Sequence, residues 1–77
     1  MKTSNSNVIV YVKQPVHREQ ASAISETIGA LHGVVEAHTS RRAGNVICVD
    51  YDPRAIDSQH ILQSVSEQGY NARLVGM

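Results

Sequence analysis

The feature that most restricts the fold of this sequence is a pair of alternating runs at its centre, residues 34–40 and 46–51. They are separated by Arg41-Arg42-Ala43-Gly44-Asn45, and Gly and Asn tolerate the positive φ angles that tight hairpin turns need. The pattern predicts a β-hairpin. A central hairpin disfavours a wholly parallel α/β sheet, because neighbouring parallel strands need a long crossover connection.

Alternation divides the hairpin residues between two faces of the predicted sheet. One face receives Ala37, Thr39, Ile47, Val49 and Tyr51. The other face receives Glu36, His38, Val46, Cys48 and Asp50. Side chains at directly opposite positions of antiparallel strands have Cβ atoms about 5 Å apart. We therefore expect His38 and Cys48 to lie close together on the second face.

Two amphipathic stretches flank the hairpin and predict helices. The first begins near Arg18, and Gly33 is predicted to end it. Asp57 is the predicted N-cap of the second helix, which Gly69 ends. The predicted buried stripes contain Ala21, Ile24, Ile28 and Leu31 in the first helix and Ile61, Leu62 and Val65 in the second.

The β-branched run at residues 8–12 predicts a first strand, which Pro15 stops, and residues 70–75 predict a last short strand. The element order is strand, helix, strand, strand, helix, strand. This order predicts a ferredoxin-like α+β sandwich (βαββαβ), in which a four-stranded antiparallel sheet carries both helices on one face. We expect residues 8–77 to form one domain and residues 1–7 to form a disordered polar tail.

The charge and the cysteine content of the sequence argue against some binding partners and some cellular locations. Seven basic and seven acidic side chains give a formal net charge of zero, which does not favour nucleic acid or anionic lipid as a partner. The single cysteine, Cys48, cannot form an internal disulfide, so we expect a reducing, cytoplasmic location. No apolar run approaches the roughly 20 residues of a membrane-spanning helix, and we expect no membrane insertion.

Three short motifs at a characteristic spacing suggest a family. They are Leu31-His32-Gly33-Val34, Val49-Asp50-Tyr51-Asp52-Pro53 and Gln68-Gly69-Tyr70. With the predicted fold, they make nearly the whole chain resemble the heavy-metal-associated domain family, which comprises small copper chaperones and the soluble domains of metal-pumping ATPases. The resemblance implies the ferredoxin-like fold and a role in metal trafficking.

The metal-binding motif of that family is missing from this sequence. The family holds its metal with Met-x-Cys-x-x-Cys in the loop that enters the first helix, and counting back from Gly33 places these three positions at Pro15, His17 and Gln20. Two thiolates on one loop are what select copper(I). What the resemblance implies here is therefore the fold, together with a loop position at which the usual ligands have been replaced.

Two places remain as candidate metal sites. His17 could ligate copper, nickel, zinc or iron, or be a solvated loop residue. His38 and Cys48, with Glu36 and Asp50 on the same face, could hold zinc or copper. In the alternative interpretation Cys48 is a small hydrophobic residue of a strand and His38 is a solvated surface residue.

The same sheet face has a second interpretation as an interface. Ile9, Tyr11, Val46 and Cys48 are apolar residues on the side that the helices do not cover, and a contiguous apolar patch often marks a binding surface. It could serve a homodimer or a different protein partner.

The sequence supports two functional hypotheses and no enzymatic activity. It contains no nucleophile–base arrangement, phosphate-binding glycine loop or paired-carboxylate motif. The first hypothesis is a small metal-binding or metal-trafficking protein in which His17 replaces the usual cysteine, with copper, nickel or zinc as the ion. The alternative is a protein–protein interaction or dimerisation module that binds no metal and uses the sheet face.

Overall fold

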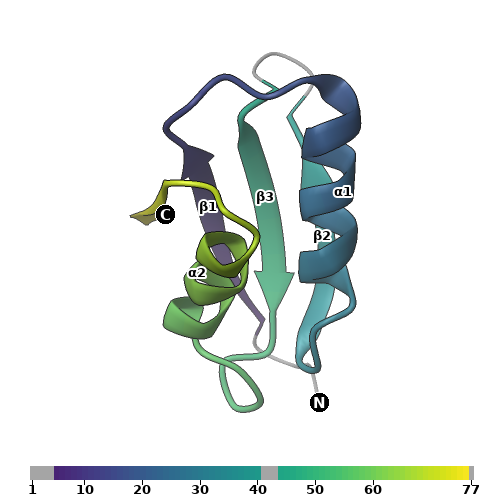
Figure 1. The fold of residues 1–77 in the computed structure, drawn as a ribbon. Helices are drawn as coiled ribbons and strands as arrows, with labels where there is room; N and C mark the ends of the chain where they lie inside the picture. The colour runs from purple at the N-terminus through teal and green to yellow at the C-terminus, as the bar shows by residue number, and fades with distance from the viewer. Residues whose placement is uncertain (1–4, 41–43, 77) are drawn as a thin grey trace.

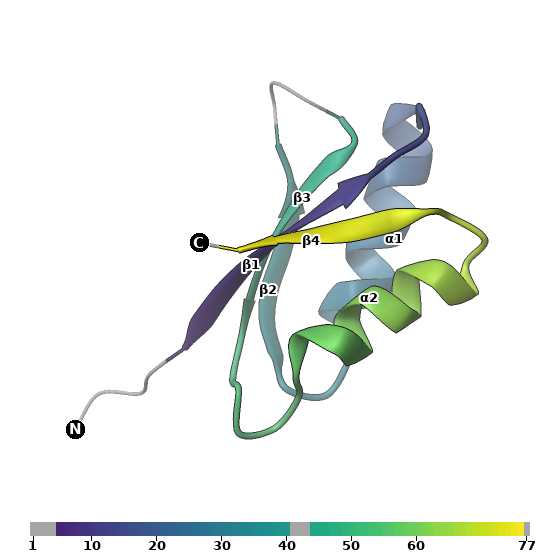
Figure 2. The same cartoon turned by 90° about the vertical axis from the view of Figure 1, so that its left-hand side faces the viewer.

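Four strands and two helices form the fold seen in a computed structural model, which describes residues 5–40 and 44–76. In chain order the elements are β1 (Ser6–Val12), α1 (Arg18–Gly29), β2 (Val34–Thr39), β3 (Val46–Tyr51), α2 (Ser58–Glu67) and β4 (Ala72–Gly76). The strand order in the sheet is β2-β3-β1-β4, and all neighbours are antiparallel. Both helices lie on one side of the sheet, and its other side is open (Figures 1 and 2). The predicted ferredoxin-like sandwich is confirmed.

The core fills the space between the sheet and the two helices. The alternating strands turn one set of side chains inward, and each helix adds the stripe that its periodicity predicted, although Leu31 and Leu62 are only partly buried. The buried hydrophobic residues are Val8, Val10, Val12, Ala21, Ile24, Ile28, Ile47, Val49, Ile61 and Val65. They are aliphatic throughout, and no buried polar residue interrupts them in the described part of the chain.

The predicted end of the first helix is wrong by several residues. Helix α1 ends at Gly29 with Ala30 as its C-cap, and the Ala30 N–H donates to the Glu26 carbonyl at 3.1 Å. Gly33 does adopt a positive φ of 100°, but it does so in the turn that leads into β2. Its carbonyl accepts the Asp52 N–H at 2.8 Å, so this turn is fixed to the end of β3.

The strand ends also differ from the predicted boundaries. Strand β1 begins at Ser6, which pairs with Tyr51, so residues 6 and 7 belong to the sheet rather than to the predicted tail. Strand β4 begins at Ala72 instead of residue 70, and β2 ends at Thr39 instead of residue 40. Residues 1–4 of the predicted tail and residues 41–43 of the predicted hairpin turn lie outside the described residues.

Asp57 is the N-cap of α2, as predicted. Its carboxylate accepts the His60 backbone N–H at 2.9 Å, and the His60 Nδ1 atom lies 2.8 Å from the same oxygen. The backbone N–H of His60 first, and then its imidazole, lower the pKa of Asp57 from its ordinary value. The charged carboxylate therefore stabilises the first turn of the helix.

Replacing Asp57 by alanine is expected to lower the melting temperature at pH 7. A carboxyl whose pKa is lowered by folding stabilises the folded state above its ordinary pKa of about 3.9, and this stabilisation is lost as the pH falls through the lower folded value. The difference between wild type and Asp57→Ala should therefore shrink as the pH falls from about 3.9 through the lower pKa of the folded state. Circular dichroism melting curves across this range measure it. His60→Ala, which keeps the backbone bond, should cost less, and a difference independent of pH would contradict the argument.

Candidate functional site

The three positions that the resemblance assigned to metal ligands lie in the loop between β1 and α1 and in the first turn of α1. His17 is the N-cap of α1, and its backbone is extended there, with φ −75° and ψ 161°. Its N–H donates to the Gln20 Oε1 atom at 2.8 Å. This bond is one half of a capping box, in which the third helical residue satisfies the backbone of the N-cap. Gln20 therefore has a structural role, and the exposed imidazole of His17 stays a candidate ligand.

Two asparagines fix the start of this loop, and sequence analysis missed both. The Lys13 N–H donates to the Asn71 carbonyl at 2.8 Å, and the Asn71 N–H donates to the Gln14 side chain at 2.8 Å. On the other side, Asn45 accepts the Val12 N–H at 2.8 Å and donates its side-chain Nδ2 to the Val12 carbonyl at 3.0 Å. The backbone of the loop is thus held from both neighbouring segments.

The donors of this loop do not fit the soft-metal site of the family. A site of that kind needs sulfur ligands, whereas the loop offers a proline, an exposed imidazole and an amide that already accepts a hydrogen bond. His17 stays a lone candidate ligand.

The predicted neighbours on the sheet do come together. In the register of β2 and β3, His38 lies directly opposite Cys48, and Cys48 is in turn opposite Ile9 of β1. Ile9 is opposite Val75 of β4, so these four residues form one row across the sheet. They belong to the side that carries no helix, which we call the open face (Figure 2). Cys48 is a half-buried free thiol, and His38 is exposed.

The acidic residues of the predicted cluster lie one row further along the sheet. Glu36 is opposite Asp50, and its Oε2 atom is 3.7 Å from the His38 Nδ1 atom. At this distance the two side chains form an ion pair only when the imidazole is protonated. Across residues 5–40 and 44–76, no three His, Cys, Asp or Glu side chains converge in a way that could hold one ion. The predicted four-residue cluster is therefore reduced to the pair of His38 and Cys48.

The apolar residues of the predicted interface also lie on the open face. Tyr11 is opposite Val46 on one side and Arg73 on the other, and Ile9 pairs with Cys48. The Arg73 guanidinium carbon lies 5.6 Å from the centre of the Tyr11 ring, a cation–π contact that holds the charge over this face. The apolar residues Ile9, Tyr11, Val46 and Cys48 lie on the face that alternation predicted. Their use as an interface stays a prediction.

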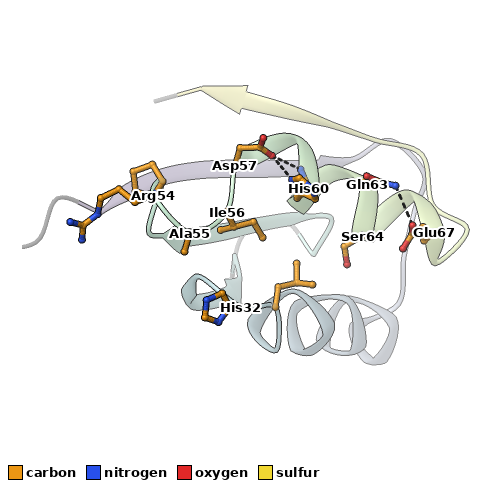
Figure 3. A pocket seen from close by; sticks show the side chains of 11 residues that line it. His32, Arg54, Ala55, Ile56, Asp57, His60, Gln63, Ser64 and Glu67 are labelled. Carbon is orange, nitrogen blue, oxygen red and sulfur yellow. Dashed lines mark hydrogen bonds and ion pairs between the residues drawn. The ribbon is translucent and has the colours of Figure 1, made fainter.

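A separate open cleft of about 670 Å³ lies between α2 and the turn that follows α1 (Figure 3). Its lining includes His32 on the α1 side and Asp57 and His60 on the α2 side. The imidazole of His60 is already bonded to Asp57. Among the described residues, the cleft brings together no three side chains that could hold one metal ion. Its lining includes no residue of the open face or of the β1–α1 loop.

Comparison with known proteins supports the fold. No family model matches the sequence, and no curated protein matches it. Solved structures do match, and three of them serve as examples. Oxidized MerP from Ralstonia metallidurans CH34 has a TM-score of 0.82 at 14% identity and covers 92% of this chain and 97% of its own. The yeast copper transporter domain Ccc2a has a TM-score of 0.78 at 21% identity, covering 91% and 94%. The copper chaperone of Enterococcus hirae has a TM-score of 0.69 at 21% identity, covering 91% and 98%.

The protein therefore has the fold of the heavy-metal-associated domains, as the resemblance predicted. At these identities the likeness concerns the fold, and the ligands must be argued from this chain's own residues. No helix in the described part of the chain is long and apolar enough to cross a membrane.

Proposed function

We propose that this protein binds a transition-metal ion on the open face of its sheet, with the Cys48 thiolate and the His38 imidazole as ligands. The observation that supports this most is the register, which sets His38 directly opposite Cys48 at the surface. Opposite Cβ atoms lie about 5 Å apart. Metal–sulfur and metal–nitrogen bonds are about 2.3 and 2.0 Å long, so one ion can bridge such a pair.

The chemistry of the pair favours copper or zinc, with nickel as a further borderline ion. Thiolate selects copper(I) and zinc, and imidazole suits copper, zinc and nickel. Glu36 stands beside one ring nitrogen of His38, where a carboxylate can orient the imidazole and leave the other nitrogen for the metal. The fold is consistent with this role, because its structural neighbours include a copper chaperone and a mercury-bound form of MerP. Metal trafficking is the corresponding cellular function.

His17 is the alternative ligand in this proposal. Its imidazole is exposed at the helix start, but a single imidazole binds a metal ion only weakly because no second donor shares the ion. The location is proposed to be cytoplasmic, since a free thiol such as Cys48 persists best in a reducing compartment. We assign no catalytic activity to the chain.

A competition titration tests the proposed site. Copper(I) and zinc(II) are each titrated against a chromophoric chelator under reducing conditions, and copper(II) and nickel(II) are titrated in the same way without reductant and without oxygen. Cys48→Ser and His38→Ala are each expected to weaken binding at least about tenfold, because either change leaves one ligand. His17→Ala is the matched control, an exposed histidine removed from the loop, and should change the affinity less than about twofold. Loss of binding in His17→Ala alone would move the site to the loop.

A second candidate function is protein docking through the same face without metal. It is favoured by the half-buried apolar residues Ile9, Tyr11 and Val46, beside which Val75 is 38% exposed. NMR amide spectra recorded with each ion in turn separate the two candidates. Shifts confined to residues around Cys48 or His17 favour metal binding, and the absence of shifts with every ion favours docking.

A further inference from the structure

The proposed site is incomplete for a tetrahedral ion within one copy of the chain. Zinc in structural sites takes four nitrogen or sulfur ligands, whereas the open face supplies one thiolate and one imidazole. Glu36 and Asp50 do not complete a set of three around one ion. A second copy of the same pair would supply the two missing ligands.

The charges of the open face are arranged to favour a second copy. Glu36 and Asp50 occupy one corner, on β2 and β3. Arg73 occupies the diagonally opposite corner, on β4, where its contact with Tyr11 holds it over the face. The row that contains His38 and Cys48 runs between these corners. The face is therefore acidic at one corner, basic at the other and apolar with two ligands between them.

We propose that two copies of this chain pack open face to open face around one zinc-type divalent ion, and that each copy provides Cys48 and His38. This inference rests on the proposed function, because it uses the same two ligands. A two-fold axis that runs diagonally between the faces brings the acidic corner of each copy over Arg73 of the other. Such a symmetric contact uses the same patch twice, as closed homodimers do.

The packing of two sheets in this manner is sterically ordinary. Sheets packed face to face lie about 10 Å apart with their side chains interdigitated. Two cysteine side chains that point into this layer from opposite sides can reach one ion between them. The contact also removes from water the apolar residues Ile9, Tyr11 and Val46 of both copies, which supplies a driving force besides the metal.

Sedimentation velocity of the full chain, with a reductant and increasing zinc chloride, tests the proposal. We expect a monomer in the presence of a chelator, and a dimer that contains one zinc ion for two chains when zinc is added. Cys48→Ser and His38→Ala should abolish the zinc-dependent dimer, while His17→Ala should not. Circular dichroism of each variant confirms that it is folded.

Charge reversal then tests the orientation of the two faces. Arg73→Glu alone should weaken the dimer at least about tenfold, because it sets like charges against each other at both contacts. Asp50→Lys alone should also weaken the dimer, because it cancels the charge of the acidic corner while leaving Glu36 beside His38. A mixture of the two variants restores opposite charges at both contacts and should form a zinc-dependent heterodimer.

The outcomes distinguish the two proposals. Zinc binding that requires Cys48 and His38 but leaves the chain monomeric at all concentrations overturns the dimer and leaves the proposed function intact. No binding of any ion overturns both. A zinc-dependent dimer that persists in Cys48→Ser and His38→Ala overturns the assignment of the ligands, and failure of the mixed variants to associate overturns the face-to-face arrangement.

Discussion

In a Cys48→Ser background, a chain that carries His17→Cys and Gln20→Cys is expected to bind copper(I) at least about a hundredfold more tightly than the chain that keeps His17 and Gln20. The two positions are the N-cap and the third residue of α1, so both side chains belong to the same helical turn. Two thiolates there restore the ligand spacing that the resemblance assigns to this loop. The positive end of the helix dipole also lowers the pKa of a cysteine at this place, which favours the thiolate that binds metal.

The measurement is a copper(I) competition titration in a Cys48→Ser background, which removes the thiol of the open face. His17→Ser with Gln20→Ser is the matched control, since it removes the same imidazole and amide without adding sulfur. Both double variants lose the bond from the His17 N–H to Gln20, which should cost about 1 kcal/mol. In the serine control the new N-cap hydroxyl should offset part of this cost. A gain shared by the serine control, or no gain with cysteine, would contradict the assignment of this loop as the family's site.

The fold could be predicted because its determinants are local and periodic. A period of two in the strands and of three to four in the helices identified the elements and their buried faces. The opposition of His38 and Cys48 followed from the same alternation, and the register confirms it. These patterns survive in the structure because shifting a strand by one residue would turn its apolar side chains outward.

The remaining features depend on contacts between distant segments. Asn45 bonds to Val12, and Asn71 bonds to Gln14, across sequence separations of 33 and 57 residues. No local pattern encodes bonds between such distant positions. The role of Gln20 was missed for a different reason: histidine is not among the residues that usually mark an N-cap. Glu36 and Asp50 do lie on the predicted face, one row from His38 and Cys48. Whether their carboxylates converge on one ion depends on side-chain directions, which alternation does not encode.

The role of Gly33 could not be read from its position after the helix. A glycine with a positive φ commonly caps a helix, and Gly69 does so directly after the C-cap of α2, with φ 96°. At Gly33 the decisive contact comes from the β3–α2 connection. A Cβ atom there would lie 2.8 Å from Cγ2 of Ile56 and 2.9 Å from Cβ of Ala55. The turn before β2 and residues 55–56 therefore approach each other too closely for any side chain.

Replacing Gly33 by alanine is accordingly expected to lower the free energy of unfolding by about 3 kcal/mol. Two costs add: about 1–2 kcal/mol for a left-handed backbone in a residue other than glycine, and about 1–3 kcal/mol for crowding against Ile56. Ile56 packs against the core, so it cannot move away freely. Urea denaturation monitored by circular dichroism measures the change.

Two other glycines separate these costs. Gly69→Ala has the same positive φ, but nothing lies within 4 Å of its new Cβ, so it should cost only about 1–2 kcal/mol. Gly29→Ala lies at the end of α1 with open space around it and a helical backbone, and should be neutral or stabilising by up to about 1 kcal/mol. The expected order of stability is thus Gly29→Ala, then Gly69→Ala, then Gly33→Ala. Equal losses at Gly33 and Gly69 would mean that Ile56 yields at little cost, and that the backbone conformation alone demands glycine before β2.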